Sequence, residues 1–222
     1  MIVAEQKPIA EIINMAFKHK SILVVGCGTC VTVCFAGGEK EVKTLSSLLR
    51  MKAQMEQKLL EIQELTVERQ CDHEFIEKIT PLAGKAEAIL SLACGAGVQL
   101  IAEKFADKIV YPGLNTTFLG ITEKQGVWKE RCLGCGTCLI DKTGGICPIA
   151  RCAKNLLNGP CGGSQEGKCE VNPETDCAWQ LIYERLKKLG QLECLEEIIP
   201  VKDWSTSRDG GPRKIIREDL TL

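Results

Sequence analysis

The sequence is poor in histidine and in aromatic residues. Only two of its 222 residues are histidine, and Phe, Trp and Tyr together make up 5%. On a helix, residues two positions apart do not face each other, so His73 and Cys71 would make a poor base–nucleophile pair. His19 has no cysteine or acidic residue close to it in the sequence. Both histidines are therefore expected to be surface or helix-capping residues.

The chain also lacks an excess of charge and a long apolar run. A net charge of −1 argues against nucleic acid or an anionic membrane as the main partner. The apolar runs are well short of the ~20 residues that a membrane span needs, and the first residues lack the layout of a signal peptide. We therefore expect a cytoplasmic protein, in which many cysteines indicate metal binding rather than disulfides.

Cysteine is what the sequence has in abundance, with 14 residues. Eight of them lie within one stretch: Cys132, Cys135, Cys138, Cys147, Cys152, Cys161, Cys169 and Cys177. The first three form a C-x2-C-x2-C run, which is typical of [4Fe–4S] binding with a fourth, more distant thiolate. Zinc usually takes two separated C-x2-C pairs, so iron–sulfur is favoured for this run.

The five later cysteines are spaced irregularly, and iron–sulfur and zinc both remain open for them. Cys147 precedes a proline, and in ferredoxins the cysteine at such a position often serves a second cluster. We therefore expect Cys147 to join a second site with some of Cys152, Cys161, Cys169 and Cys177.

A second group of cysteines lies in the amino-terminal half. Cys27, Cys30 and Cys34 follow the apolar run 21–25 in a glycine-containing turn, and Cys94 follows the run 86–93 in the same way. The carboxyl ends of parallel strands share one edge of a sheet, where ligands bind, so these cysteines are expected to meet. A cluster is favoured, with buried packing residues and a Cys27–Cys30 redox dithiol as alternatives. The isolated Cys71 and Cys194 are expected to be packing residues.

Alternating strand and helix signals predict an α/β protein. Strands are expected over 21–25, 64–69, 86–93, 108–111 and 117–122, and helices over 8–20, 37–58, 72–79, 94–106, 175–190 and 191–198. The pattern predicts a small Rossmann-like parallel-sheet domain over 1–115. A cysteine-rich, ferredoxin-like metal-binding domain with C-terminal helices follows over 116–222. The polar tail from Trp204 to Ile216 has no periodicity and is expected to lie on a partner protein.

Several motifs of the second half resemble the C-terminal-domain family of methylenetetrahydrofolate reductase. They are the triple-cysteine run, Gly145-Ile-Cys-Pro-Ile-Ala150, Cys152-Ala-Lys-Asn-Leu-Leu-Asn-Gly-Pro-Cys-Gly-Gly163 and Trp204-Ser-Thr-Ser-Arg-Asp-Gly-Gly-Pro212. The stand-alone form of this family is the small iron–sulfur subunit of MetVF-type reductases. The resemblance implies a MetF-like flavoprotein partner, which reduces 5,10-methylenetetrahydrofolate to the 5-methyl form.

This resemblance implies a non-catalytic electron-relay subunit of an oxidoreductase. Two or three [4Fe–4S] clusters are expected in this chain, with zinc in place of one still open, and a flavin in the partner. The electron donor stays open between ferredoxin, a reduced nicotinamide acting through another subunit, and a larger electron-transfer complex. A structural zinc module that docks onto a catalytic partner is the alternative function.

Overall fold

The computed structural model describes residues 1–220, and its contacts divide the chain into two compact units. The first unit is Met1–Trp128, and the second begins at Lys129.

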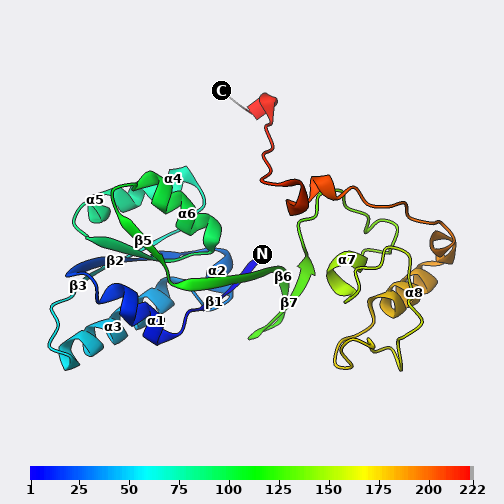
Figure 1. Ribbon diagram of the computed structural model, residues 1–222, viewed down its shortest axis with the longest axis horizontal. Coiled ribbons are helices and arrows are strands. Elements are labelled where there is room, and N and C mark those ends of the chain that lie inside the picture. The colour runs from blue at the N-terminus through cyan, green and yellow to red at the C-terminus, as the bar shows by residue number, and fades with distance from the viewer. Residues whose placement is uncertain (221–222) are drawn as a thin grey trace. The chain divides into compact units, whose positions relative to one another are not determined.

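A four-stranded parallel sheet forms the centre of the first unit (Figure 1). Its strands are β2 (Ser21–Cys27), β3 (Glu61–Val67), β4 (Ala88–Leu92) and β5 (Ile109–Pro112). They lie in the order β3-β2-β4-β5, and each neighbouring pair is parallel. The α/β class with a parallel sheet, predicted from the strand–helix alternation, is confirmed.

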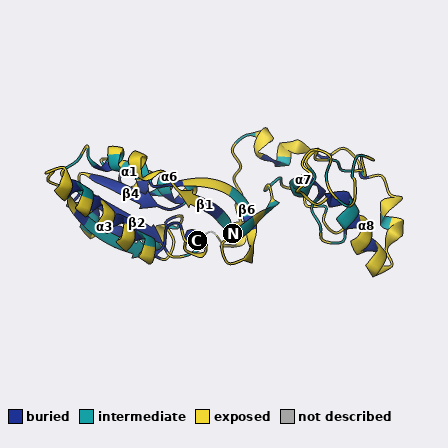
Figure 2. Ribbon diagram, turned by 90° about the horizontal axis from the view of Figure 1, so that it is seen from below, coloured by how far each residue is buried: buried dark blue, intermediate teal, exposed yellow. Residues whose placement is uncertain are grey.

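Alternate residues of the central strands point into two separate cores. Ile22 and Val24 pack with α1 and α3, whereas Leu23 and Val25 pack with α4, α5 and α6. The helices are α1 (Ile9–Ala16), α3 (Glu39–Met55), α4 (His73–Ile76), α5 (Thr80–Ala83) and α6 (Gly95–Lys104). β2 and β4 are covered on both faces, so their sequences are mostly apolar and do not alternate with polar residues. Figure 2 shows both strands as buried.

The helix predicted over 72–79 is broken into pieces. After α4 come a 3-10 turn, η1 (Glu77–Ile79), and then α5. Pro81 lies in the first turn of α5, where a missing backbone N–H is tolerated. The proline therefore suits the start of a new helix better than the continuation of an old one.

A second sheet contains three strands in the order β1-β6-β7: β1 (Ile2–Gln6), β6 (Leu114–Lys124) and β7 (Val127–Cys132). Of these, only β6 lies where the sequence predicts a strand. β1 pairs antiparallel with β6, with Val3 opposite Phe118. The domain boundary predicted at 115/116 falls within β6 and stays a prediction.

The second unit contains little regular structure. Its helices are α7 (Pro148–Arg151) and α8 (Ala178–Leu189), and its 3-10 turns are η2 (Leu192–Leu195), η3 (Trp204–Thr206), η4 (Arg208–Gly210) and η5 (Glu218–Leu220). The helix predicted over 175–190 is confirmed as α8, which ends at Gly190 in a left-handed conformation. The helix predicted over 191–198 is only the short turn η2.

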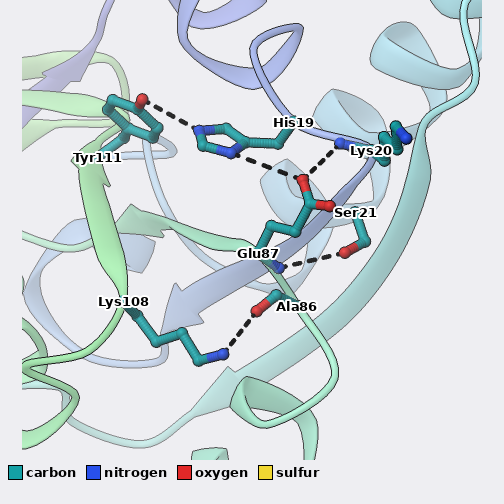
Figure 3. Close-up of polar contacts among 7 residues, drawn as sticks. All are labelled: His19, Lys20, Ser21, Ala86, Glu87, Lys108 and Tyr111. Carbon is teal, nitrogen blue, oxygen red and sulfur yellow. Dashed lines mark hydrogen bonds and ion pairs between the residues drawn. The ribbon is translucent and has the colours of Figure 1, made fainter.

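The sequence predicts His19 to be a surface or helix-capping residue, but in the structure its side chain is mostly buried. Its ring is 3.1 Å from the Tyr111 hydroxyl and 3.8 Å from the Glu87 carboxylate, and only 11% of its side chain is exposed (Figure 3). Glu87 also accepts a bond from the Lys20 amide at 2.8 Å. Lys20 and Glu87 immediately precede β2 and β4, so this network ties together the sheet edge opposite the cysteines. This network could not be predicted from the sequence, because strand pairing brings its residues together.

Within residues 1–220, no helix has the length and apolar content needed to cross a membrane.

Candidate metal centres

Two of the predicted cysteines lie at the switch point of the parallel sheet. Cys27 is the last residue of β2, and Cys94 follows β4 as the N-cap of α6. From β2 the chain passes to β3 on one side, and it then returns to place β4 on the other side. The carboxyl ends of two such strands flank the crevice where open α/β sheets bind ligands. Cys27 and Cys94 thus lie at the carboxyl ends of two adjacent strands, and their sharing of one metal site stays a prediction.

Cys71 lies at the same edge, although the sequence analysis assigned it to packing. It is an exposed residue in the loop between β3 and α4. Partial burial of the thiol raises the pKa of Cys71, and the nearby thiols of Cys94 and Cys27 raise it further. The missed signal was the repetition of one cysteine beyond each of three adjacent strands.

The other two amino-terminal cysteines flank α2 (Cys30–Val33). Cys30 begins this helix and is partly buried, whereas Cys34 follows it and is buried in the core. The Cys34 thiol donates to the carbonyl oxygen of Ile2 in β1 at 3.6 Å. Burial raises the pKa of Cys34, and the neighbouring Cys30 adds to this rise. Cys34 is therefore directed toward β1.

The triple-cysteine run forms a loop that begins at the end of β7. Cys132 and Cys138 are exposed, and Cys135 is partly buried. The Gly134 amide donates to the Cys132 sulfur at 3.3 Å.

The tail, which the sequence predicts to lie on a partner protein, contacts this loop of its own chain. The Lys202 ammonium donates to the Thr137 carbonyl at 2.8 Å, and the Thr206 hydroxyl donates to the Cys135 carbonyl at 3.2 Å. Arg213 donates to the Gly134 carbonyl. The tail is held by polar side chains that bond to backbone carbonyls, so no apolar periodicity revealed it. We call residues 202–213 the tail clamp.

Four of the later cysteines line one small cavity of about 20 Å³: Cys152, Cys161, Cys169 and Cys177. The cavity is bordered by the ion pair of Lys154 with Glu170. The Cys177 amide bonds to the Gly167 carbonyl at 2.7 Å, and the Cys169 amide bonds to the Thr175 carbonyl at 2.9 Å. These bonds fix the two segments that carry the last two thiols.

Cys147 stands outside that group as the N-cap of α7. Its sulfur accepts a bond from the Ala150 amide at 3.4 Å, and the Cys161 sulfur accepts one from the Gly163 amide at 3.4 Å. With the bond from Gly134 to Cys132, three cysteines of this unit thus accept backbone N–H bonds. Hydrogen bonds of this kind surround the sulfurs of iron–sulfur clusters and tune their potentials.

Across residues 1–220, no three side chains of Cys, His, Asp and Glu converge as a single metal ion would require. In a [4Fe–4S] cubane each thiolate binds a different iron, so its ligands lie farther apart than those of one ion. The amide bonds to sulfur and the grouping of thiols on short loops fit thiolate ligands. The assignment of particular cysteines to particular sites stays a prediction.

The two units together define a cysteine-rich α/β protein. Residues 111–205 match the family described as methylene-tetrahydrofolate reductase C terminal. The resemblance found in the cysteine motifs is thereby confirmed. Neither a curated protein nor a solved structure matches the chain.

Proposed function

We propose that this chain is an electron-transfer subunit of a methylenetetrahydrofolate reductase. It would pass electrons to a MetF-like flavoprotein that reduces 5,10-methylenetetrahydrofolate to 5-methyltetrahydrofolate. The observation that carries the proposal is the triple-cysteine loop, with Cys132 and Cys138 exposed, within a segment that matches a reductase family.

Cys132, Cys135 and Cys138 would hold one [4Fe–4S] cluster, with a fourth thiolate from the Cys147–Cys177 region. When bound, such a cluster exchanges single electrons, whereas a flavin can collect two and deliver a hydride. The protein's own contribution is to hold the loop. The tail clamp bonds to its backbone carbonyls, and the Gly134 amide donates to the Cys132 sulfur. Exposure of Cys132 and Cys138 suits a site that exchanges electrons with another protein.

A structural zinc module is the second candidate for the cavity lined by Cys152, Cys161, Cys169 and Cys177. Its four cysteines line one cavity. Four thiolates are also a common ligand set for structural zinc. Zinc at this site is compatible with electron transfer through the triple-cysteine loop.

The proposal is tested with protein purified anaerobically together with its flavoprotein. We expect iron in multiples of about four per chain, and reduction of the partner's flavin when reduced ferredoxin is added. Cys135→Ser should lose about four irons and this flavin reduction, whereas Cys194→Ser should retain both. Cys194 is the control because it lies in η2 outside the predicted sites. A chain that holds only zinc and leaves the flavin oxidised would support the structural module instead.

A further inference from the structure

We propose that Cys71 is a ligand of the amino-terminal metal site, together with Cys27, Cys30 and Cys94, and that Cys34 is not. That the bound group is an iron–sulfur cluster rests on the proposed function. It changes the ligand set predicted from the sequence by exchanging one cysteine for another.

The first argument is topological. β3, β2 and β4 are adjacent and parallel, so their carboxyl ends lie side by side at one edge of the sheet. Cys27 ends β2, Cys94 follows β4, and Cys71 lies four residues beyond the last residue of β3, Val67. The loop that follows β3 begins close to Cys27, since the Cys27 thiol is 3.9 Å from the Glu68 carbonyl oxygen. One thiol thus comes from each of three neighbouring strand ends.

Gln70 holds Cys71 at this edge. Its side chain is fully buried and donates to the Val25 carbonyl in β2 at 2.9 Å, and it accepts a bond from the Ser91 hydroxyl in β4 at 2.6 Å. It also packs on the first turn of α6, where a Cβ on Gly97 would come within 2.8 Å of the Gln70 Cβ. The residue before Cys71 is therefore fastened to the two strands that carry Cys27 and Cys94.

Cys34 is occupied elsewhere. Its thiol donates to the Ile2 carbonyl, and Cys34 lines a hollow with Glu5 and Trp128 on the side of β1. The chain turns immediately after it, since Phe35 has a φ of 53°. Cys34 is thus a buried packing residue, as free cysteines often are. Cys30 supplies the fourth ligand, because it stands in a C-x2-C pair with Cys27 at the start of α2.

The test uses the full chain, purified anaerobically, with iron and zinc per chain and the EPR spectrum of the reduced protein as readouts. Cys71→Ser and Cys94→Ser should each lose about four irons and one EPR component, given four irons per cluster. Cys34→Ser should retain both. Because Cys71 is exposed, its replacement should leave the fold intact, which the far-UV circular dichroism of each variant checks.

Three outcomes would overturn the inference. If Cys34→Ser lost the irons and Cys71→Ser kept them, the set predicted from the sequence would be right. If Cys27→Ser also kept all the metal, the amino-terminal edge would hold none, and Cys27 and Cys30 would be a dithiol or packing pair. If the Cys71→Ser variant lost zinc instead of iron, the site would bind zinc and not an iron–sulfur cluster. None of these results affects the triple-cysteine loop, where Cys135→Ser tests the proposed function separately.

Discussion

Gly136 is a residue of the triple-cysteine loop that lies against Thr206 of the tail clamp. Its φ is +90°, and an added Cβ would lie 2.5 Å from both the Cβ and the carbonyl oxygen of Thr206. Only glycine combines this backbone conformation with this separation. The spacing C-x2-C-G-T-C therefore reflects the tail as well as the cluster.

Gly136→Ala should separate the loop from the clamp. We expect the free energy of unfolding of the second unit to fall by about 2 kcal/mol or more. Overpacking and a left-handed alanine each cost about 1–2 kcal/mol. We also expect faster loss of iron during anaerobic gel filtration. The matched control is Gly145→Ala, because Gly145 has a φ of +85° with no atom within 4 Å of its Cβ position. Equal effects of the two substitutions would mean that the contact with Thr206 does not matter.

At the scale of elements, the tail clamp has a different role from the one its composition suggests. A segment with tryptophan, arginine and a Gly-Gly-Pro turn is typical of a protein interface. In the structure, Lys202 and Thr206 instead bond to carbonyls of the cysteine loop, and Lys202 also lies 5.7 Å above the Trp204 ring. The clamp positions the loop by satisfying its backbone acceptors.

Truncation tests this role. A chain that ends at Pro200 lacks Lys202, Thr206 and Arg213, and it should lose about four irons, the content of one cluster. A chain that ends at Arg213 keeps the three side chains and should keep its iron. Iron per chain in the two proteins, purified anaerobically, is the measurement. If the shorter chain retained full iron but no longer co-purified with the flavoprotein, the tail would act at the interface, as the sequence suggested.

At the scale of the whole molecule, the two units differ in what holds them together. The first unit contains two apolar cores, on either face of the parallel sheet. In the part of the second unit that the structure describes, the hydrophobic core cluster has four buried residues: Cys177, Trp179, Ile182 and Leu186. A core of this size contributes too little burial to offset the conformational entropy of folding, so bound metal is expected to supply the rest.

Removal of metal should therefore unfold one unit and spare the other. After iron and zinc are chelated, we expect the amides of α8 to lose hydrogen-exchange protection by about two orders of magnitude or more, as in metal-dependent small domains. The amides of β2 and β4 should exchange as slowly as before. Mass spectrometry of the exchanged peptides measures both in one sample. Unchanged protection of α8 would show that its four-residue core is sufficient.

Local pattern was enough to predict several parts of this protein. The run Ile22–Val25 is apolar because β2 is covered on both faces, and α8 shows helical spacing followed by a C-capping glycine. The triple-cysteine run is also local, since three ligands of one cluster fit on one short loop. In each case the residues that interact are close in the sequence, so their spacing records the structure.

Tertiary structure decided what depends on strand order and on distant contacts. β1 is five residues long, and its partner β6 lies in the second half of the chain, so no local pattern marks the pair. The position of Cys71 beside Cys27 and Cys94 follows from the order β3-β2-β4 and from the buried bonds of Gln70. The tail clamp is likewise built from side-chain bonds to backbone carbonyls, which leave no periodicity. These features required the fold because each joins residues that only chain topology brings together.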